Sequence, residues 1–226
     1  KNPSVYVNSN INGFFNILEV SKEYSIKHLL FASTSSVYGN NKNYPLNEDY
    51  STDKPLSFYA ATKKCNEVMA YSFSNIYNLP CTGLRFFTVY GPLGRPDMSL
   101  FKFTKNIINN NNINLFNNGN HIRDFTYIDD LIEYINRIIL KIPKKNPPFE
   151  IYNIGSGKPK HLKYFVKVIE NILQKKAKIK YLDMQQGDVH KTHADVSKIN
   201  TKVGKFEITN FNTGIQKFID WFKSSR

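Results

Sequence analysis

The run Leu29-Leu30-Phe31-Ala32 is the feature that most restricts how this chain can fold. These residues are apolar without alternation, which is typical of a strand buried on both faces of a parallel sheet. Four hydroxyl residues, Ser33-Thr34-Ser35-Ser36, follow at once. Open α/β sheets bind ligands at the carboxyl ends of their strands, so this hydroxyl block is a candidate site. The alternative is that the hydroxyls only cap the strand and begin a turn.

The rest of the chain alternates between strand-like runs and helical periods, which predicts an α/β fold without internal repeats. Expected strands cover 28–33, 80–87, 113–116, 150–154 and 177–182, and expected helices cover 11–25, 57–77, 99–110, 129–141, 161–174 and 212–223. Loops are expected at 39–56 and 141–148. Residues 117–120, Asn-Asn-Gly-Asn, have the composition of a hairpin-like turn.

Tyr59 and Lys63 lie four residues apart in the expected helix 57–77 and therefore share one helix face. A lysine ammonium beside a phenol favours the phenolate, so it lowers the tyrosine pKa from about 10 towards neutrality. A tyrosine with such a pKa can take a proton from a sugar hydroxyl and return it. The spacing alone also fits a surface lysine one turn away from a half-buried tyrosine.

Other motifs place this pair in a family. The segments Thr34-Ser35-Ser36-Val37-Tyr38-Gly39, Tyr59-x-x-x-Lys63 and Leu84-Arg85-Phe86-Phe87-Thr88-Val89-Tyr90-Gly91-Pro92 together resemble the extended short-chain dehydrogenase/reductase family. Within it the chain most resembles the UDP-glucuronate 4-epimerases, with supporting segments at 94–98, 123–130, 152–155, 187–189 and 192–195. The resemblance covers essentially the whole chain. It implies the carboxyl-terminal part of a Rossmann-like parallel-sheet domain plus a smaller α/β substrate-binding domain.

The resemblance also implies a division of the chain. Residues 1–90 would be the remaining half of the NAD-binding Rossmann-like domain, and 91–226 would mainly form the nucleotide-sugar substrate domain, with some segments returning to the first. The family opens with a Gly-rich turn that holds the NAD pyrophosphate at a helix amino end, and no Gly-x-x-Gly-x-x-Gly occurs here. We therefore expect a carboxyl-terminal fragment that alone neither retains NAD stoichiometrically nor turns over substrate.

Carried over to this sequence, the family's reaction is NAD-dependent 4-epimerisation of a UDP-sugar through a 4-keto intermediate. The resemblance makes Tyr59 the base at the 4-hydroxyl, Lys63 the ligand of the nicotinamide ribose, and Thr34 the bridge between Tyr59 and the sugar oxygen. The implied NAD contacts are Ser33, Tyr59, Lys63, Phe86, Phe87 and Val89. Phe86 and Phe87 fit plain strand core equally well.

The substrate that the resemblance implies is UDP-glucuronate, which would become UDP-galacturonate. The implied substrate contacts are Thr34, Ser35, Ser36, Thr88 and Arg95 at the sugar, and Arg123, Gln185 and Asp188 at the nucleotide. Related dehydratases and decarboxylases carry acids around Ser35 and Ser36, so this chain lacks an obvious acid or base for elimination or decarboxylation.

Three alternatives stay open on the sequence. Arg123 could form a salt bridge with Asp124 or Asp129 in place of a diphosphate contact. The enzyme could be a 4-epimerase for UDP-galactose or a UDP-N-acetylhexosamine. The chain could also be a non-catalytic remnant that binds a nucleotide sugar.

The composition of the chain restricts which classes of binding partner are expected. The net charge of +13 comes from lysines scattered along the chain without an Arg-rich run or a zinc pattern, so we expect attraction of an anionic nucleotide sugar and no nucleic-acid partner. No apolar run approaches the roughly 20 residues of a membrane span. Cys65 and Cys81 make neither a metal pattern nor a disulfide framework. We expect a cytoplasmic enzyme without metal or membrane partners, and the resemblance implies a homodimer through helices 11–25 and 57–77.

Overall fold

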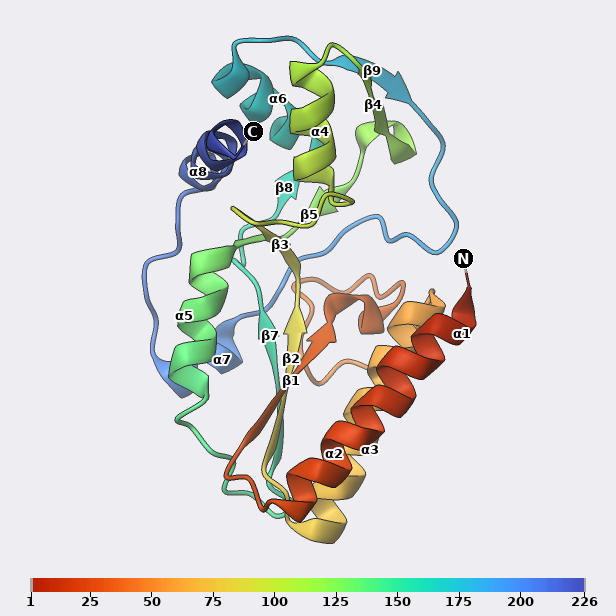
Figure 1. Cartoon of the computed structure of the whole chain (residues 1–226), viewed down its shortest axis with the longest axis vertical. Coiled ribbons are helices and arrows are strands. Elements are labelled where there is room, and N and C mark those ends of the chain that lie inside the picture. The colour runs from red at the N-terminus through yellow and green to blue at the C-terminus, as the bar shows by residue number, and fades with distance from the viewer. Residues whose placement is uncertain (1, 226) are drawn as a thin grey trace.

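A three-stranded parallel sheet organises the chain in the computed structural model, which describes residues 2–225. Its strand order is β1 (Leu29–Thr34), β2 (Cys81–Phe86) and β7 (Phe149–Ile154). The register pairs Thr34 with Phe86 and Phe86 with Ile154, so the three strands end at one level. This common carboxyl edge lies at the middle of the molecule (Figure 1).

Two long helices cover one face of the sheet (Figure 1). The first is a continuous run of α1 (Pro3–Tyr6), the π-helical η1 (Val7–Asn12) and α2 (Gly13–Glu23), and the second is α3 (Phe58–Tyr77). Leu18, Phe31, Ala70 and Cys81 are buried together between them and the sheet. The predicted start of the first helix at residue 11 is wrong, because Asn2 caps an earlier turn with Pro3 at its first position.

The opposite face of the sheet is covered by α5 (Ile128–Ile138) and α7 (Ser197–Val203). Their core joins Leu84 and Tyr152 of the sheet to Tyr134 and Ile199 of the helices. The chain therefore returns to this half twice, first with α5 and β7 and later with α7, and it enters the other half before, between and after these returns.

The remaining long elements form the other half of the molecule in Figure 1. It contains α4 (Ser99–Ile108), β4 (Asn112–Leu115), α6 (Leu162–Leu173), β9 (Lys178–Tyr181) and α8 (Phe211–Ser224). β4 and β9 pair in parallel. Phe103, Ile113, Phe165 and Phe218 are among the side chains that build its core.

Short strands join the two halves. β3 (Thr88–Tyr90) pairs in parallel with β6 (Phe125–Tyr127), and β5 (Ile122–Arg123) pairs antiparallel with β8 (Lys160–His161). Two short 3-10 turns, η2 (Ser35–Tyr38) and η3 (Phe116–Gly119), follow β1 and β4.

The predicted α/β fold is confirmed, but the hairpin-like turn at 117–120 is wrong. Asn117 and Asn118 do reverse the chain in the left-handed region, with φ of 51° and 50°. The strands on either side of them then pair elsewhere, β4 with β9 and β5 with β8. Within residues 2–225 no helix has the length and apolarity needed to cross a membrane.

Candidate active site

Tyr59 and Lys63 lie in the first two turns of α3, at the carboxyl edge of the sheet. The Ser57 side chain caps the helix by accepting a hydrogen bond of 3.2 Å from the Ala60 N–H. Lys63 is half-buried, and burial lowers its pKa. Among residues 2–225 no hydrogen bond or ion pair engages the Lys63 ammonium. Its charge is therefore available to the phenol one turn away.

The start of α3 is fixed to the π-helical segment. The Thr62 hydroxyl donates to the Tyr59 carbonyl at 2.8 Å and accepts from Asn10 Nδ2 at 2.9 Å. Asn66 Nδ2 in turn donates to the Asn10 carbonyl at 2.6 Å. A π-helical turn lets a carbonyl point out of the helix, and such turns are frequent at functional sites. The position of Tyr59 is thus held from two helices.

Tyr59 borders a hollow of about 610 Å³. Its walls come from Pro3 and Tyr6 of α1, Ser57 to Tyr59, and Gln185 and Gln186. The Tyr6 and Tyr59 ring centroids are 5.9 Å apart, and Tyr59 is 36% exposed. The structure therefore brings together Tyr59 and Gln185, two predicted site residues that are distant in the sequence. The volume lies within the range of small-molecule pockets, about 300–1,000 Å³.

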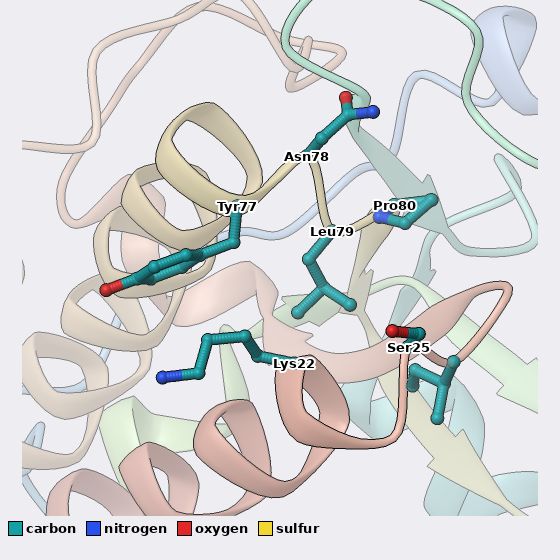
Figure 2. Close-up of a pocket in the computed structure, with 7 residues that line it drawn as sticks. Lys22, Ser25, Tyr77, Asn78, Leu79 and Pro80 are labelled. Carbon is teal, nitrogen blue, oxygen red and sulfur yellow. The ribbon is translucent and has the colours of Figure 1, made fainter.

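A smaller hollow of about 210 Å³ lies where α2 and α3 end (Figure 2). Lys22, Tyr77, Asn78 and Pro80 are among its walls. The Lys22 ammonium is already paired with Glu19 at 3.0 Å and lies 4.7 Å from the centre of the Tyr77 ring. This hollow is at the amino ends of β1 and β2, the edge that α/β sheets do not use for ligands.

The hydroxyl block spans the end of β1, with Ser33 and Thr34, and the start of η2, with Ser35 and Ser36. Thr34 Oγ1 accepts from the Ser36 N–H at 3.2 Å and donates to Ser36 Oγ at 3.3 Å, so Thr34 caps the η2 turn. Ser35 and Ser36 are half-buried. Within residues 2–225 no hydrogen bond joins Thr34 to Tyr59. The turn-capping interpretation is therefore realised for Thr34, and its bridging role stays a prediction.

The predicted residues after β2 take different positions. Phe87 is buried with Val37, Tyr38 and Leu46, so it is core in this structure, whereas Phe86 and Val89 are half-buried. The Thr88 N–H donates to the Asp124 carbonyl at 3.0 Å.

Arg95 forms no hydrogen bond or ion pair with the other predicted sugar-binding residues within residues 2–225. Its side chain is 74% exposed and forms a bidentate pair with Asp97, at 3.1 Å and 2.9 Å. The hydrogen bonds from Arg95 lower the pKa of Asp97. Arg95 would have to leave Asp97 before it could bind a substrate.

Arg123 and Asp188 contact each other. Arg123 Nη2 donates to Asp188 Oδ1 at 2.8 Å, and Arg123 Nη1 donates to the His190 carbonyl at 3.1 Å. The alternative pairing of Arg123 with Asp124 or Asp129 is wrong. Asp129 lies 3.9 Å from Lys217. The fold therefore joins two predicted nucleotide contacts, and the Asp188 N–H donates to the carbonyl of Gln185 at 3.2 Å.

Two residues near Arg123 were not predicted as site residues. His121 Nε2 lies 3.2 Å from Asp188 Oδ2, without the alignment of a hydrogen bond. Burial and the Arg123 charge lower the pKa of His121. Asp124 is fully buried and accepts from Ser156 N, Ser156 Oγ, Gly157 N and Ala194 N at 2.7 to 3.1 Å. Asp124 thus ties the segments at 156–157 and at 194 to its own, and its position next to Arg123 in the sequence was the signal that could have pointed to it.

Comparison with known proteins matches residues 1–155 to the family described as the NAD dependent epimerase/dehydratase family. The chain is 48% identical to protein CapI of Staphylococcus aureus, over 98% of this chain and 71% of that protein. It is 40% identical to a UDP-glucuronate 4-epimerase of Thermodesulfobacterium geofontis, over 100% of this chain and 68% of that protein.

A solved structure shares this fold and arrangement. It is the UDP-glucuronic acid 4-epimerase from Bacillus cereus in complex with UDP-glucuronic acid and NAD. The TM-score is 0.91 at 32% identity, covering 98% of this chain and 69% of that one. The chain thus spans about 70% of the length of such proteins.

Proposed function

Since this chain belongs to the NAD dependent epimerase/dehydratase family, we propose that it carries the catalytic and substrate-binding residues of a UDP-glucuronate 4-epimerase. The observation that carries the proposal is that Tyr59 shares one face of α3 with the half-buried Lys63, which has no partner within residues 2–225. Tyr59 also borders the hollow that Gln185 lines. The relatives and the Bacillus cereus structure support the choice of UDP-glucuronate.

The residues at the carboxyl edge fit the NAD that the family uses. A half-buried ammonium without a partner in residues 2–225 suits the hydroxyls of a nicotinamide ribose, and Phe86 and Val89 offer half-buried apolar surface nearby. NAD, when bound, supplies the acceptor and donor of the hydride at carbon 4 of the sugar. Ser33 and Phe87, also proposed as NAD contacts, are buried. They would affect NAD binding by fixing the backbone at the carboxyl ends of β1 and β2.

The chemical role of this chain is proton transfer and orientation. Tyr59 takes the 4-hydroxyl proton as the sugar becomes a 4-keto sugar, and it returns the proton after the hydride has been delivered to the other face. The Lys63 charge stabilises the phenolate. Thr34 orients the sugar oxygen towards Tyr59. No residue has to remove a proton from carbon 5, which agrees with the hydroxyl side chains at positions 35 and 36.

Specificity for a carboxylated sugar is assigned to Ser35, Ser36 and Thr88. Their hydroxyls donate hydrogen bonds, and bonds to charged groups contribute about 1.5–3 kcal/mol each. Arg95 would add to this site only after it breaks its exposed pair with Asp97.

The nucleotide end is assigned to Arg123, Gln185 and Asp188. A guanidinium matches the planar oxygens of a phosphate. Asp188 would accept hydrogen bonds from the uridine ribose, and Gln185 would contact the phosphates. In this proposal 1–90 contributes the dinucleotide side of the site and 91–226 mainly the substrate side.

The assembly that we propose is a homodimer through α2 and α3. The outer faces of these adjacent helices expose Phe15, Ile17, Val20, Val68, Tyr71 and Ile76, each between 45% and 64%. An apolar patch of this kind on two neighbouring helices suits pairing with the same patch of a second copy, to give four packed helices. Light scattering of the Val68→Glu variant should show a shift to monomer.

The proposed function is tested with a substrate panel and the full product of the gene. UDP-glucuronate, UDP-glucose and UDP-N-acetylglucosamine are offered separately, and kcat/KM is measured for each. The highest value for UDP-glucuronate, with UDP-galacturonate as product, is the expected result. A preference for either neutral sugar would move the assignment to the UDP-galactose or UDP-N-acetylhexosamine alternative. No turnover of any of the three would favour the non-catalytic remnant.

A further inference from the structure

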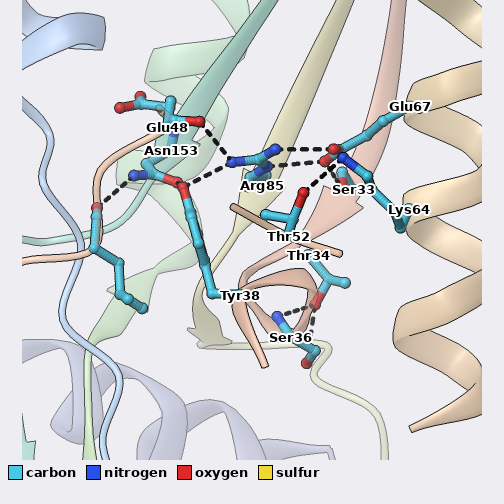
Figure 3. Close-up of polar contacts among 11 residues, drawn as sticks. Ser33, Thr34, Ser36, Tyr38, Glu48, Thr52, Lys64, Glu67, Arg85 and Asn153 are labelled. Atoms are coloured by element: carbon cyan, nitrogen blue, oxygen red, sulfur yellow. Dashed lines mark hydrogen bonds and ion pairs between the residues drawn. The ribbon is translucent and has the colours of Figure 1, made fainter. Parts of the chain in front are cut away.

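Figure 3 shows a buried ion pair between Arg85 of β2 and Glu67 of α3. Arg85 Nε and Nη2 donate to the two oxygens of Glu67, each at 2.9 Å. The side chains are only 4% and 2% exposed. A bidentate pair of this kind fixes the direction of the carboxylate as well as its position.

Arg85 is held on its other side too. Arg85 Nη1 donates to Tyr38 Oη at 3.0 Å and to the Glu48 carbonyl at 3.2 Å, and Tyr38 Oη donates to Asn153 Oδ1 at 2.7 Å. Burial alone would lower the pKa of Arg85, but its bonds to Glu67 and Tyr38 outweigh burial and raise it. Burial raises the pKa of Tyr38 to about 12, so this phenol keeps its proton. Arg85 is therefore a fixed cation on β2.

Glu67 has both carboxylate oxygens occupied. Besides the two bonds from Arg85, its Oε1 accepts from Ser33 Oγ at 2.6 Å. Glu67 comes four residues after Lys63 and eight after Tyr59, so all three lie on one face of α3. A lysine and a glutamate at this spacing ordinarily attract each other. In residues 2–225 they form no ion pair, because the carboxylate is turned to the sheet.

We propose that Arg85 is a positioning residue for the reaction: by holding Glu67 it keeps that carboxylate away from Lys63, so that the Lys63 charge acts on Tyr59. This inference rests on the proposed function, since it takes Tyr59 as the base. Without Arg85 the Glu67 carboxylate would keep only its bond from Ser33, and from one turn away it would balance the Lys63 ammonium and favour the protonated phenol.

Within residues 2–225 the other charged and titratable groups around this face form no ion pair or hydrogen bond with Lys63. Tyr6 of α1 contacts the Tyr59 ring, Lys64 donates to Thr52, and Glu48 accepts from the Asn153 N–H. On the other packed elements, Lys22 and Glu19 of α2 pair with each other, and Glu150 of β7 pairs with Lys202. Glu67 is the carboxylate one helix turn from Lys63, and the Arg85 pair fixes its direction.

The test measures the Tyr59 pKa directly, by NMR of the full gene product with tyrosine isotopically labelled at Cζ. The resonance is assigned by its loss in Tyr59→Phe. Arg85→Gln should raise the Tyr59 pKa by about 1 unit or more, the usual effect of losing a nearby opposite charge. Each unit lowers the phenolate fraction at neutral pH about tenfold, and the acid limb of the kcat profile should move with it.

The double variant Arg85→Gln/Glu67→Gln gives the decisive comparison. It removes the carboxylate that Arg85→Gln releases, so the Tyr59 pKa should return towards the wild-type value even though the fold stays less stable. If Arg85→Gln does not fold, Arg85→Lys keeps a buried cation. Its ammonium lacks the bidentate fork, so it should raise the Tyr59 pKa by a smaller amount.

Glu150→Gln is the matched control. Glu150 is a buried carboxylate of the same sheet, 8% exposed and 2.8 Å from Lys202, at the opposite edge. Its loss should lower Tm and leave the Tyr59 pKa unchanged. A Tyr59 pKa that stays at the wild-type value in Arg85→Gln or Arg85→Lys, or that stays raised in the double variant, overturns the inference. A wild type with neither epimerase activity nor a lowered Tyr59 pKa would instead overturn the proposed function.

Discussion

Arg123 Nη2 donates a hydrogen bond of 2.8 Å to Asp188 Oδ1 across 65 residues of sequence. Both residues are assigned to the nucleotide, one to its phosphates and one to its ribose. A diphosphate that binds Arg123 therefore has to compete with Asp188 for the guanidinium. In the proposed site the released carboxylate, which still accepts from the Val189 N–H at 2.8 Å, would accept the ribose hydroxyls. The pair would thus hold both side chains close to their binding positions before the substrate binds.

Arg123→Gln should weaken UDP binding and change kcat little, because it removes charged bonds to a part of the substrate that does not react. The expected loss of affinity is about 10- to 100-fold, from about 1.5–3 kcal/mol per bond to a charged group. Calorimetric titration with UDP measures it. Arg137→Gln is the control, since Arg137 pairs with Glu133 and covers Phe206 away from the site. Equal affinity in wild type and Arg123→Gln would remove Arg123 from the nucleotide site.

Thr88→Ala should reduce kcat/KM for UDP-glucuronate much more than any residual kcat/KM for UDP-glucose. A site that donates hydrogen bonds loses most on the substrate that accepts them best. One bond to a carboxylate corresponds to about a tenfold to hundredfold loss. Thr201→Ala on α7 removes an exposed threonine and serves as the control. Equal losses on both substrates would show that Thr88 does not read the carboxylate.

Acidification should destabilise the fold through His121. Burial and then the Arg123 charge lower the pKa of His121, with Asp188 acting against them, so the unfolded chain binds the proton more readily. Stability from neutral His121 is present above its unfolded pKa of about 6.5 and is lost as the pH falls below that value. His121→Gln should flatten this part of a plot of Tm against pH. His161→Gln, which removes an exposed imidazole on β8, is the control. The same slope in wild type and His121→Gln would show that another group carries the effect.

The long elements of the fold were predictable because their own residues specify them. The expected helix 57–77 is α3, with Ser57 as its cap and Asn78 ending it in the left-handed region at φ 53°. The apolar run at 29–32 is the centre of β1. In contrast, β3 and β6 have three residues each, too few for a periodic pattern, and their pairing depends on contacts between distant segments. The chain reversal at 117–120 was predicted correctly. The predicted hairpin was wrong because β4 pairs with β9, a strand much later in the sequence.

Only those site residues that lie in recognisable sequence motifs could be predicted. Tyr59 and Lys63 share a helix face as their spacing requires, and Arg123 and Asp188 meet. Sequence reasoning missed the pair of Arg85 and Glu67, although a charged residue inside the apolar strand 80–87 was a signal for a buried partner. It could not foresee that Arg95 turns to Asp97, since the direction of an exposed side chain is decided by its neighbours in the fold.

Tyr59→Phe should abolish epimerisation while UDP-sugar binding stays nearly intact, because it deletes one hydroxyl and little volume. Loss of a general acid–base group costs about 10²–10⁴ in rate. Turnover and binding are measured on the same preparation of the full gene product. Tyr164→Phe is the control, since Tyr164 lies on α6 with its hydroxyl bonded to Asn212. Wild-type turnover in Tyr59→Phe would rule out Tyr59 as the base.

The central claim is that this chain serves a 4-epimerase in which the hydride leaves carbon 4 and returns to the same atom. It is tested most directly by incubating the full gene product with UDP-glucuronate that carries deuterium at carbon 4. The account predicts UDP-galacturonate that retains the deuterium at carbon 4, formed by wild type and not by Tyr59→Phe. UDP-galacturonate that has exchanged this deuterium for solvent hydrogen, or no UDP-galacturonate at all, would contradict it.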